Sequence, residues 1–291
     1  EFFMNLVTPP MYREIDPTPL IAIFFPLFFG LIVGDIGYGL VILCFSLAVR
    51  YKFREIPWIC QLMSILMISS IPTMIFGYFY GEFFGDLGEH MGWIHPITLF
   101  GITWNRIEAI IPLLILTIGI GVFHVFLGLS LGILNAYRHH KTRHIIEKAG
   151  MLGLLSGILL LLGAYAGHVP GSVTFAVIAL MLASIGCLIY GGGSRGVIEV
   201  MGTIGNIMSY ARLMAIGLAS VILALVANRL SHELGILVLG IIVAILLHTL
   251  NIFLAMFSPS IHSLRLHVVE FFSKFYEGGG VPYKPFGKER L

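Results

Sequence analysis

The sequence predicts an all-α protein that crosses a membrane about eight times. Hydrophobic residues make up 58% of the 291-residue chain, and only 11% of the residues are charged, less than half of the roughly 25% that soluble domains carry. Several charge-free runs reach the ~20 residues that a helix needs to cross a bilayer. So little charge excludes a water-soluble fold and a disordered chain. The formal net charge of +2 leaves no basic surplus for nucleic acid, which we exclude as a partner.

We place the membrane domain at residues 20–277, because the charge-poor runs lie there. Residues 149–194 contain no Asp, Glu, Lys or Arg, and the Gly167–Gly171 stretch is expected to divide this run. We also divide the first run at Asp35, because a carboxylate at the centre of the bilayer costs several kcal/mol and a turn near the interface avoids that cost. The expected segments are about 20–34, 36–50, 56–81, 107–137, 146–166, 172–191, 197–229 and 234–276.

The distribution of basic residues predicts the orientation of the segments. Cytoplasmic loops of membrane proteins are enriched in Lys and Arg. With eight segments the opposite side carries only Arg106 and Arg229, so both termini are predicted to be cytoplasmic. Twelve basic residues lie on the cytoplasmic side: Arg50, Lys52, Arg54, Arg138, Lys141, Arg143, Lys148, Arg195, Lys274, Lys284, Lys288 and Arg290.

Arg212 is the first candidate functional residue, because it lies near the middle of the expected segment 197–229. A guanidinium keeps its proton in proteins, and such a charge costs ~2.5–3.5 kcal/mol at a helix centre on insertion scales. No acidic residue lies three or four positions away on the same face. We therefore expect a carboxylate on another helix or another chain, with a structural ion pair inside the bundle as the alternative.

Other charged or titratable residues in the expected segments could have either a functional or a structural role. Arg265 lies nearer the cytoplasmic end, where a functional role and simple snorkelling to the interface are equally good explanations. Glu199 lies thirteen residues before Arg212, about 20 Å along a helix, and either lines an aqueous funnel or is solvated at the interface. Glu270 follows Arg265 by five residues, which places it about 140° away around an α-helix. We expect His248 to be hydrogen-bonded to a neighbouring helix, with a proton relay as the alternative.

The sequence shows no enzyme motif. Gly191, Gly193 and Gly196 match GxGxxG, but a dinucleotide site needs a strand before that motif. The three cysteines form no CxxC pair. We expect no catalytic residue, cofactor, metal or nucleotide site on this chain.

Three sequence motifs carry a resemblance to a known family: the stretch from Phe25–Gly30 to Gly34–Gly39, the arginine motif Ser209–Leu213, and His262–Glu270 followed by Ser273–Tyr276. They resemble the membrane part of the stator subunit a, or subunit I, of V-type and archaeal or bacterial A-type rotary ATPases. The tail Gly280–Phe286 fits as well, and Asp16–Pro19 resembles the archaeal and bacterial branch.

The resemblance implies an organisation and a set of partners. Residues 1–19 would be the cytoplasmic lead-in from a missing N-terminal arm, and residues 278–291 a cytoplasmic tail. The last two helices would be long and tilted, next to a rotating proteolipid ring. Two aqueous half-channels would lead H⁺ or Na⁺ to that ring, coupled to ATP hydrolysis or synthesis on other subunits. The remaining partners would be peripheral-stalk and central-stalk subunits and lipid, in the cell membrane of an archaeon or bacterium.

The resemblance also implies residue roles. Arg212 would be the stator arginine that meets the ring carboxylate, and Arg265 the second arginine beside a half-channel. Vacuolar members carry a histidine and a glutamate where this chain has Ser220 and Ala255, so other polar groups must line the outer half-channel. The candidates for lining either half-channel are Glu199, His262, Glu270, Ser220, Ser258 and Ser260.

Two other classes of function remain as alternatives. A secondary ion transporter would show internal repeats with paired broken helices, and no convincing repeat is present. A structural membrane scaffold would leave the central arginine unexplained.

Overall fold

The computed structural model describes residues 10–12, 14–99, 101–167, 173–233 and 237–280. Within these ranges the chain is almost entirely helical, and six helical stretches are long and apolar enough to cross a membrane. This confirms the predicted all-α polytopic class. Most of the expected lead-in (residues 1–9) and of the expected tail (residues 281–291) lies outside the described residues. The chain forms two compact units: unit 1 holds residues 1–18, 123–205 and 271–291, and unit 2 holds residues 19–122 and 206–270.

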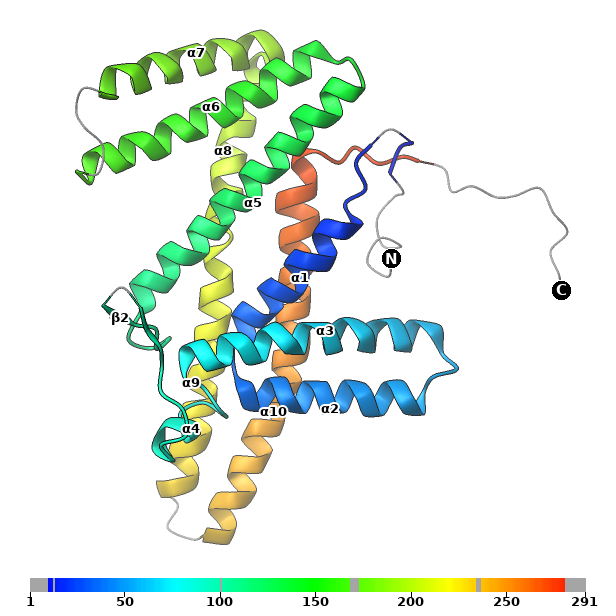
Figure 1. Cartoon of the computed structure of the whole chain (residues 1–291), viewed down its shortest axis with the longest axis vertical. Coiled ribbons are helices and arrows are strands. Elements are labelled where there is room, and N and C mark those ends of the chain that lie inside the picture. Colours follow the sequence, from blue (N-terminus) through cyan, green and yellow to red (C-terminus); the bar gives the residue numbers. More distant parts are fainter. Residues whose placement is uncertain (1–9, 13, 100, 168–172, 234–236, 281–291) are drawn as a thin grey trace, which may run out of the picture. The chain divides into compact units, whose positions relative to one another are not determined.

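Unit 2 contains two antiparallel helix pairs, α2 with α3 and α9 with α10 (Figure 1). Its apolar core brings together residues from α1, α2, α3, α9 and α10, such as Phe29, Tyr38, Leu66, Ala224 and Ala255. Its elements are α1 (Thr18–Val33), α2 (Ile36–Lys52), α3 (Pro57–Tyr80), α4 (Leu87–His90), the hairpin β1 (Thr98–Leu99) and β2 (Ile102–Thr103), the first part of α5 (Ile110–Arg138), α9 (Ala211–Glu233) and α10 (Leu237–Arg265).

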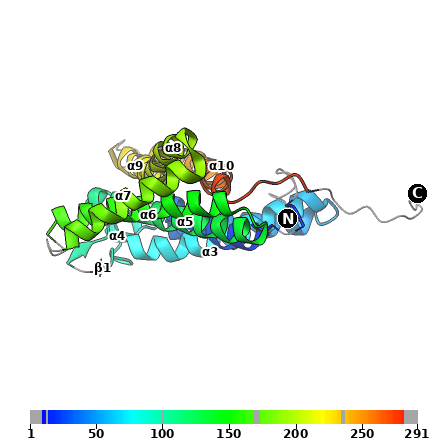
Figure 2. The ribbon, with the colours of Figure 1, turned by 90° about the horizontal axis from the view of Figure 1, so that it is seen from above.

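Unit 1 is built on the antiparallel pair α6 (Thr142–Tyr165) and α7 (Thr174–Gly192), which lie side by side in both views (Figures 1 and 2). Small residues allow the close approach: a Cβ added at Gly150 would lie 2.9 Å from the carbonyl oxygen of Ser184. The unit also holds the second part of α5 and most of α8 (Ser194–Met208).

A buried guanidinium, Arg106, closes the end of α1 in unit 2. It is 4% exposed, and it donates hydrogen bonds to the carbonyls of Ile32 (2.8 Å), Val33 (2.9 Å) and Gly34 (3.1 Å). These are among the carbonyls that a helix leaves without an internal partner at its C-terminus. Arg106 also donates to both carboxylate oxygens of Glu82. One side chain therefore neutralises a buried acid and satisfies the end of a helix.

Asp35 begins the next helix from the same turn. Its backbone is extended, and its carboxylate accepts from the amides of Tyr38 (3.0 Å), Phe84 (3.1 Å) and Gly85 (2.7 Å). The first of these bonds caps α2, and the other two hold the segment that follows α3. Burial raises the pKa of Asp35, and the three amides oppose that rise. The break between α1 and α2 lies at Gly34 and Asp35, with Gly34 at a φ of +41°.

Two of the expected long segments are interrupted. The segment expected at 197–229 contains α8 and α9, separated by Ser209 and Tyr210. The amides there bond to carbonyls three residues back instead of four, as in Tyr210 N to Ile207 O (3.1 Å). The segment expected at 234–276 contains α10, a π-helical stretch over Leu266–Phe271 and a 3₁₀ turn over Phe272–Lys274.

Replacing Arg106 with methionine should lower the stability of the protein. Arg106→Met leaves the Glu82 carboxylate buried without a cation, which costs about 3–5 kcal/mol. The midpoint of thermal denaturation in detergent micelles measures the effect. Arg50→Met, at an exposed arginine near the end of α2, is the matched control and should leave the midpoint unchanged. Equal midpoints for the two variants would show that the Arg106 contacts do not stabilise the fold.

A second prediction concerns the contact of α3 with the turn at Asp35. A Cβ added at Gly77 would lie 2.7 Å from the carbonyl carbon of Asp35, a backbone atom that cannot move aside cheaply. Gly77→Ala should therefore cost about 1–3 kcal/mol of stability. Gly119→Ala on α5, where a Cβ meets nothing within 4 Å, should be neutral or slightly stabilising. Denaturation midpoints compare the two, and a stable Gly77→Ala protein would contradict the contact.

Candidate functional site

Arg212 lies in the first turn of α9, directly after the interruption at Ser209 and Tyr210. The Tyr210 ring is fully buried and meets Phe28 of α1 edge to face, with ring centroids 5.9 Å apart. The amide of Arg212 donates to the Ser209 carbonyl at 3.2 Å. The buried tyrosine thus fixes the point at which α9 starts and the arginine is presented.

Glu270 lies next to Arg212. Arg212 Nη1 and Glu270 Oε1 are 3.8 Å apart, which is an ion pair but too long for a hydrogen bond. The Arg212 side chain is 23% exposed and the Glu270 side chain 2% exposed. Glu270 lies on another helical element of the same chain, which agrees both with the expected distant carboxylate and with its alternative, a structural ion pair inside the bundle. The arginine keeps an open side, whereas the carboxylate is enclosed by the protein.

The π-helical stretch determines where Glu270 points. An α-helix would place Glu270 about 140° around the axis from Arg265. In a π-helix the hydrogen bonds run from i to i+5, so residues five apart lie about one turn from each other. The sequence-based angle therefore does not apply to this pair. His267 is the second residue of the stretch, and its Nδ1 lies 2.7 Å from the Ser263 carbonyl.

Arg265 and His262 lie on the last turn of α10 and complete the site. Arg265 is exposed and His262 is half-buried. Both arginines are close enough to act electrostatically on His262 and on Glu270. We call Arg212, Arg265, His262 and Glu270 the arginine cluster. With two arginines and one carboxylate, it carries a net positive charge.

The exposed face of α9 around Arg212 is apolar. Its exposed residues follow a helical spacing of three and four after Arg212: Ala215, Ala219 and Ile222. The two alanines are the nearest exposed neighbours of Arg212 on the C-terminal side. Small residues at such a face let another helix approach closely, so the guanidinium is accessible to a partner in the membrane.

Ser220 lies two turns further along α9 and is not part of the arginine cluster. Its hydroxyl donates to Asn251 Oδ1 at 3.2 Å, and Asn251 Nδ2 donates to the Tyr38 hydroxyl at 2.8 Å. Ser220, Asn251 and Ser258 line a cavity of about 190 Å³ between α1, α9 and α10. Ala255 is buried at its edge.

Glu199 lies in unit 1, whereas the other candidate residues lie in unit 2. Lys148 Nζ donates to Glu199 Oε1 at 2.7 Å. Lys274, nearby, donates to the Thr203 hydroxyl at 2.7 Å. Glu199 and both lysines line a cavity of about 220 Å³. The acid is therefore salt-bridged, which the sequence did not indicate, because Lys148 is 51 positions away.

His248 is hydrogen-bonded to a neighbouring helix, as predicted: its Nδ1 lies 2.9 Å from the Tyr38 hydroxyl on α2. The sequence analysis did not predict that Tyr38 and Asn228 are both hydrogen-bonded to His248. The available signal was an asparagine and a histidine in apolar segments, which are weak evidence when taken singly. Among the described residues, no group of three or more His, Cys, Asp or Glu side chains could hold a metal ion.

Comparison with known proteins gives a consistent result. Residues 197–287, which include the arginine cluster, match the sequence model of the V-type ATPase 116kDa subunit family. The chain is 36% identical to A-type ATP synthase subunit I of Archaeoglobus fulgidus, over 96% of this chain and 50% of that protein. It is 30% identical to the subunit I of Pyrococcus abyssi (100% and 46%) and 28% identical to V-type ATP synthase subunit I of Borreliella burgdorferi (98% and 51%).

The apolar helices and the partly exposed arginine define a polytopic membrane protein with a permanent charge inside its membrane segments. The sequence similarities show that it is a relative of the subunit I proteins of A-type and V-type ATP synthases, which confirms the resemblance seen in its motifs. The chain spans about half the length of the curated relatives it matches.

The pairing of Arg212 with Glu270 can be measured by a double-mutant cycle. Arg212→Gln leaves a buried carboxylate without its cation, so adding Glu270→Gln should restore part of the lost stability. We expect a coupling energy of about 1–3 kcal/mol from denaturation in micelles.

The pair Lys141–Glu277 is the matched control. Lys141 donates to both oxygens of Glu277 (2.9 and 3.1 Å), and these hydrogen bonds lower the pKa of Glu277. Its side chains are 43% and 58% exposed, so solvent screening should keep its coupling below about 1 kcal/mol. Equal coupling energies for the two pairs would contradict a special role for the buried carboxylate.

Proposed function

We propose that this chain forms the stator membrane region of a rotary V/A-type ATPase. It would work against a rotating proteolipid ring and couple the translocation of H⁺, or Na⁺, to ATP hydrolysis or synthesis on other subunits. The observation that carries the proposal is the partly exposed Arg212 on the small-residue face of α9. The family relationship gives this charge a partner of the required kind, a carboxylate on each ring subunit.

The chemistry of a ring carboxylate explains why an arginine is needed. A carboxylate that faces lipid must be neutral, because a bare charge in hydrocarbon is costly. A cation at close range favours the ionised form, so the carboxylate releases its ion when it reaches Arg212. An arginine keeps its charge at this position, whereas a buried lysine can lose its proton.

Glu270 and Arg265 adjust the charge of the site. The Glu270 carboxylate, enclosed by protein, holds the guanidinium from one side and leaves its open side for the ring. Since Arg265 adds a second positive charge nearby, the cluster attracts a ring carboxylate and repels a free cation. That repulsion prevents ions from passing directly between the two half-channels.

Aqueous access to the ring would come from both sides of the membrane. We assign Glu199 to the cytoplasmic half-channel, and we assign His262, Glu270 and Ser220 to half-channel lining next to the arginines. The partners would be the proteolipid ring, peripheral-stalk and central-stalk subunits and lipid, in an archaeal or bacterial cell membrane with both termini cytoplasmic.

ATP-driven ion uptake into inverted membrane vesicles tests the proposal. In the assembled complex, Arg212→Gln should reduce uptake by at least about 100-fold, because the charge that ionises the ring carboxylate is lost. Arg212→Lys should retain a small part of the rate. Arg54→Gln, at an exposed arginine between α2 and α3, should behave like the wild type. Subunit content and ATP hydrolysis are followed in the same preparations.

Wild-type uptake by an intact Arg212→Gln complex would overturn the assigned role of the arginine. Purification of the protein without an associated proteolipid ring, under conditions that preserve the complex, would count against the function as a whole.

A further inference from the structure

The motif Phe25–Gly30 on α1 is not part of the arginine cluster, although its aromatic rings are deeply buried. Phe28 and Phe29 are both 0% exposed. Neighbouring residues point about 100° apart on an α-helix, so the two rings pack on different faces of α1. Phe29 joins the apolar core of unit 2, which includes Tyr38 and Leu66. Phe28 makes a different set of contacts.

The Phe28 ring contacts two other buried rings, those of Tyr210 and His267. It meets the Tyr210 ring edge to face with centroids 5.9 Å apart, and the His267 ring with centroids 5.2 Å apart. Both distances fall within the roughly 4.5–7 Å at which aromatic rings attract each other. Tyr210 belongs to the interruption before α9, and His267 belongs to the π-helical stretch. One side chain of α1 therefore contacts both irregular segments that adjoin the arginine cluster.

These two contacts lie close in sequence to the two halves of the ion pair. Tyr210 precedes Arg212 by two residues, and His267 precedes Glu270 by three. At 3.8 Å the guanidinium and the carboxylate are not joined by a hydrogen bond that would fix their separation. The separation therefore depends on where the backbone holds each of the two residues.

A second contact with α1 lies two turns after Tyr210 on α9. Gly217 is buried, and a Cβ added there would lie 2.8 Å from the Ile32 carbonyl oxygen and 3.0 Å from Arg106 Nη1. The backbone of α9 thus lies directly on the capped end of α1. Two contacts with the same helix fix both the position of α9 along α1 and the face that α9 turns toward it.

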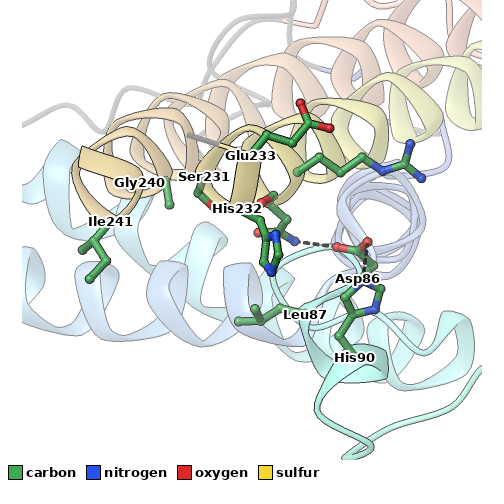
Figure 3. A pocket seen from close by; sticks show the side chains of 11 residues that line it. Asp86, Leu87, His90, Ser231, His232, Glu233, Gly240 and Ile241 are labelled. Atoms are coloured by element: carbon green, nitrogen blue, oxygen red, sulfur yellow. Dashed lines mark hydrogen bonds and ion pairs between the residues drawn. The ribbon is translucent and has the colours of Figure 1, made fainter. Parts of the chain in front are cut away.

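The far end of α9 is attached to the segment after α3. Asn228 Nδ2 donates to Asp86 Oδ1 (2.6 Å) and to the Phe84 carbonyl (2.9 Å). Asn228 and Asp86 line a pocket of about 680 Å³ between α4, the end of α9 and the start of α10 (Figure 3). Because Gly217 and Asn228 hold the rest of the helix, a change at Phe28 affects the start of α9, where Arg212 lies.

We propose that Phe28 is a positioning residue for the ion pair of Arg212 and Glu270. Its ring holds the start of α9 and the π-helical stretch in place together, so the enclosed carboxylate stays on one side of the guanidinium. A smaller side chain at this position leaves space into which either segment settles, and the distance between the two charges changes. The consequence for transport rests on the proposed function, in which a ring carboxylate meets the open side of Arg212.

Two matched substitutions on α1 test the proposal. Phe28→Leu and Phe29→Leu each remove one fully buried ring, so both should lower the midpoint of denaturation by a similar amount. The coupling energy between Arg212 and Glu270 is then measured by a double-mutant cycle in each background. It should fall to less than about half of its original value with Phe28→Leu and stay unchanged with Phe29→Leu. Equal coupling energies in the two backgrounds would overturn the positioning role, because a ring that only stabilises the fold affects the midpoint alone.

Phe28→Met keeps the proposal testable if the leucine variant does not fold. Methionine fills the space but is flexible, so it preserves burial without holding the two neighbouring rings in place. The coupling energy between Arg212 and Glu270 should again fall. An unchanged coupling energy in the Phe28→Met protein would overturn the proposal.

The consequence for transport is measured in the assembled complex. Phe28→Leu should lower ATP-driven ion uptake by at least about tenfold, because a displaced group loses much of its effect on the reaction. Phe29→Leu should transport at the wild-type rate, and subunit content is followed in both preparations.

The Arg212→Gln complex separates the positioning role from the proposed function. If Arg212→Gln transports ions normally while the coupling energy depends on Phe28, the proposed function fails and the positioning role stands. If Arg212→Gln stops uptake while Phe28→Leu and Phe29→Leu show equal coupling energies and equal uptake, the positioning role fails and the proposed function stands.

Discussion

The buried guanidinium of Arg106 is the interaction on which unit 2 depends. Its donors close the carbonyl end of α1 and bind Glu82, while Asp35, one residue beyond the last of those carbonyls, caps α2 and holds the segment after α3. Three stretches far apart in sequence are thereby joined at one turn. α1 and α2 are short helices of 16 and 17 residues, so this polar turn, as well as apolar packing, must determine how they enter the bundle. Tyr38, in the first turn of α2, is positioned by the same cap.

The fold class could be predicted from composition alone, and the interruption at Asp35 from the cost of a carboxylate in lipid. The interruption at Ser209 and Tyr210 could not, because apolar residues continue on both sides of it. The reason for it is tertiary: the Tyr210 ring fills a site against Phe28. The π-helical stretch could not be predicted from the sequence either, since the composition of Leu266–Phe271 does not distinguish a π-helix from an α-helix.

The candidate site, like the fold, could be predicted from the sequence only in part. Arg212 stood out because a permanent charge in an apolar segment has few explanations, and its requirement for a distant carboxylate followed from the same reasoning. That Glu270 is this carboxylate did not follow, because the assumed α-helical geometry related Glu270 only to Arg265 and gave no position relative to Arg212, which lies on another helix. The Lys148–Glu199 pair and the hydrogen bonds of Tyr38 join residues 51 and up to 213 positions apart, and no local pattern carries such contacts.

The π-helical stretch has a consequence for how this protein is compared with its relatives. A π-helix is an α-helix into which one residue has been inserted. A relative that lacks one residue between positions 266 and 271 would continue as an α-helix, and everything after the missing residue would rotate by about 100°. A single-residue gap at this place in an alignment therefore marks a change in where Glu270 lies relative to Arg212. The electrostatic environment of Arg212 changes with it, although every charged residue of the motif is still present.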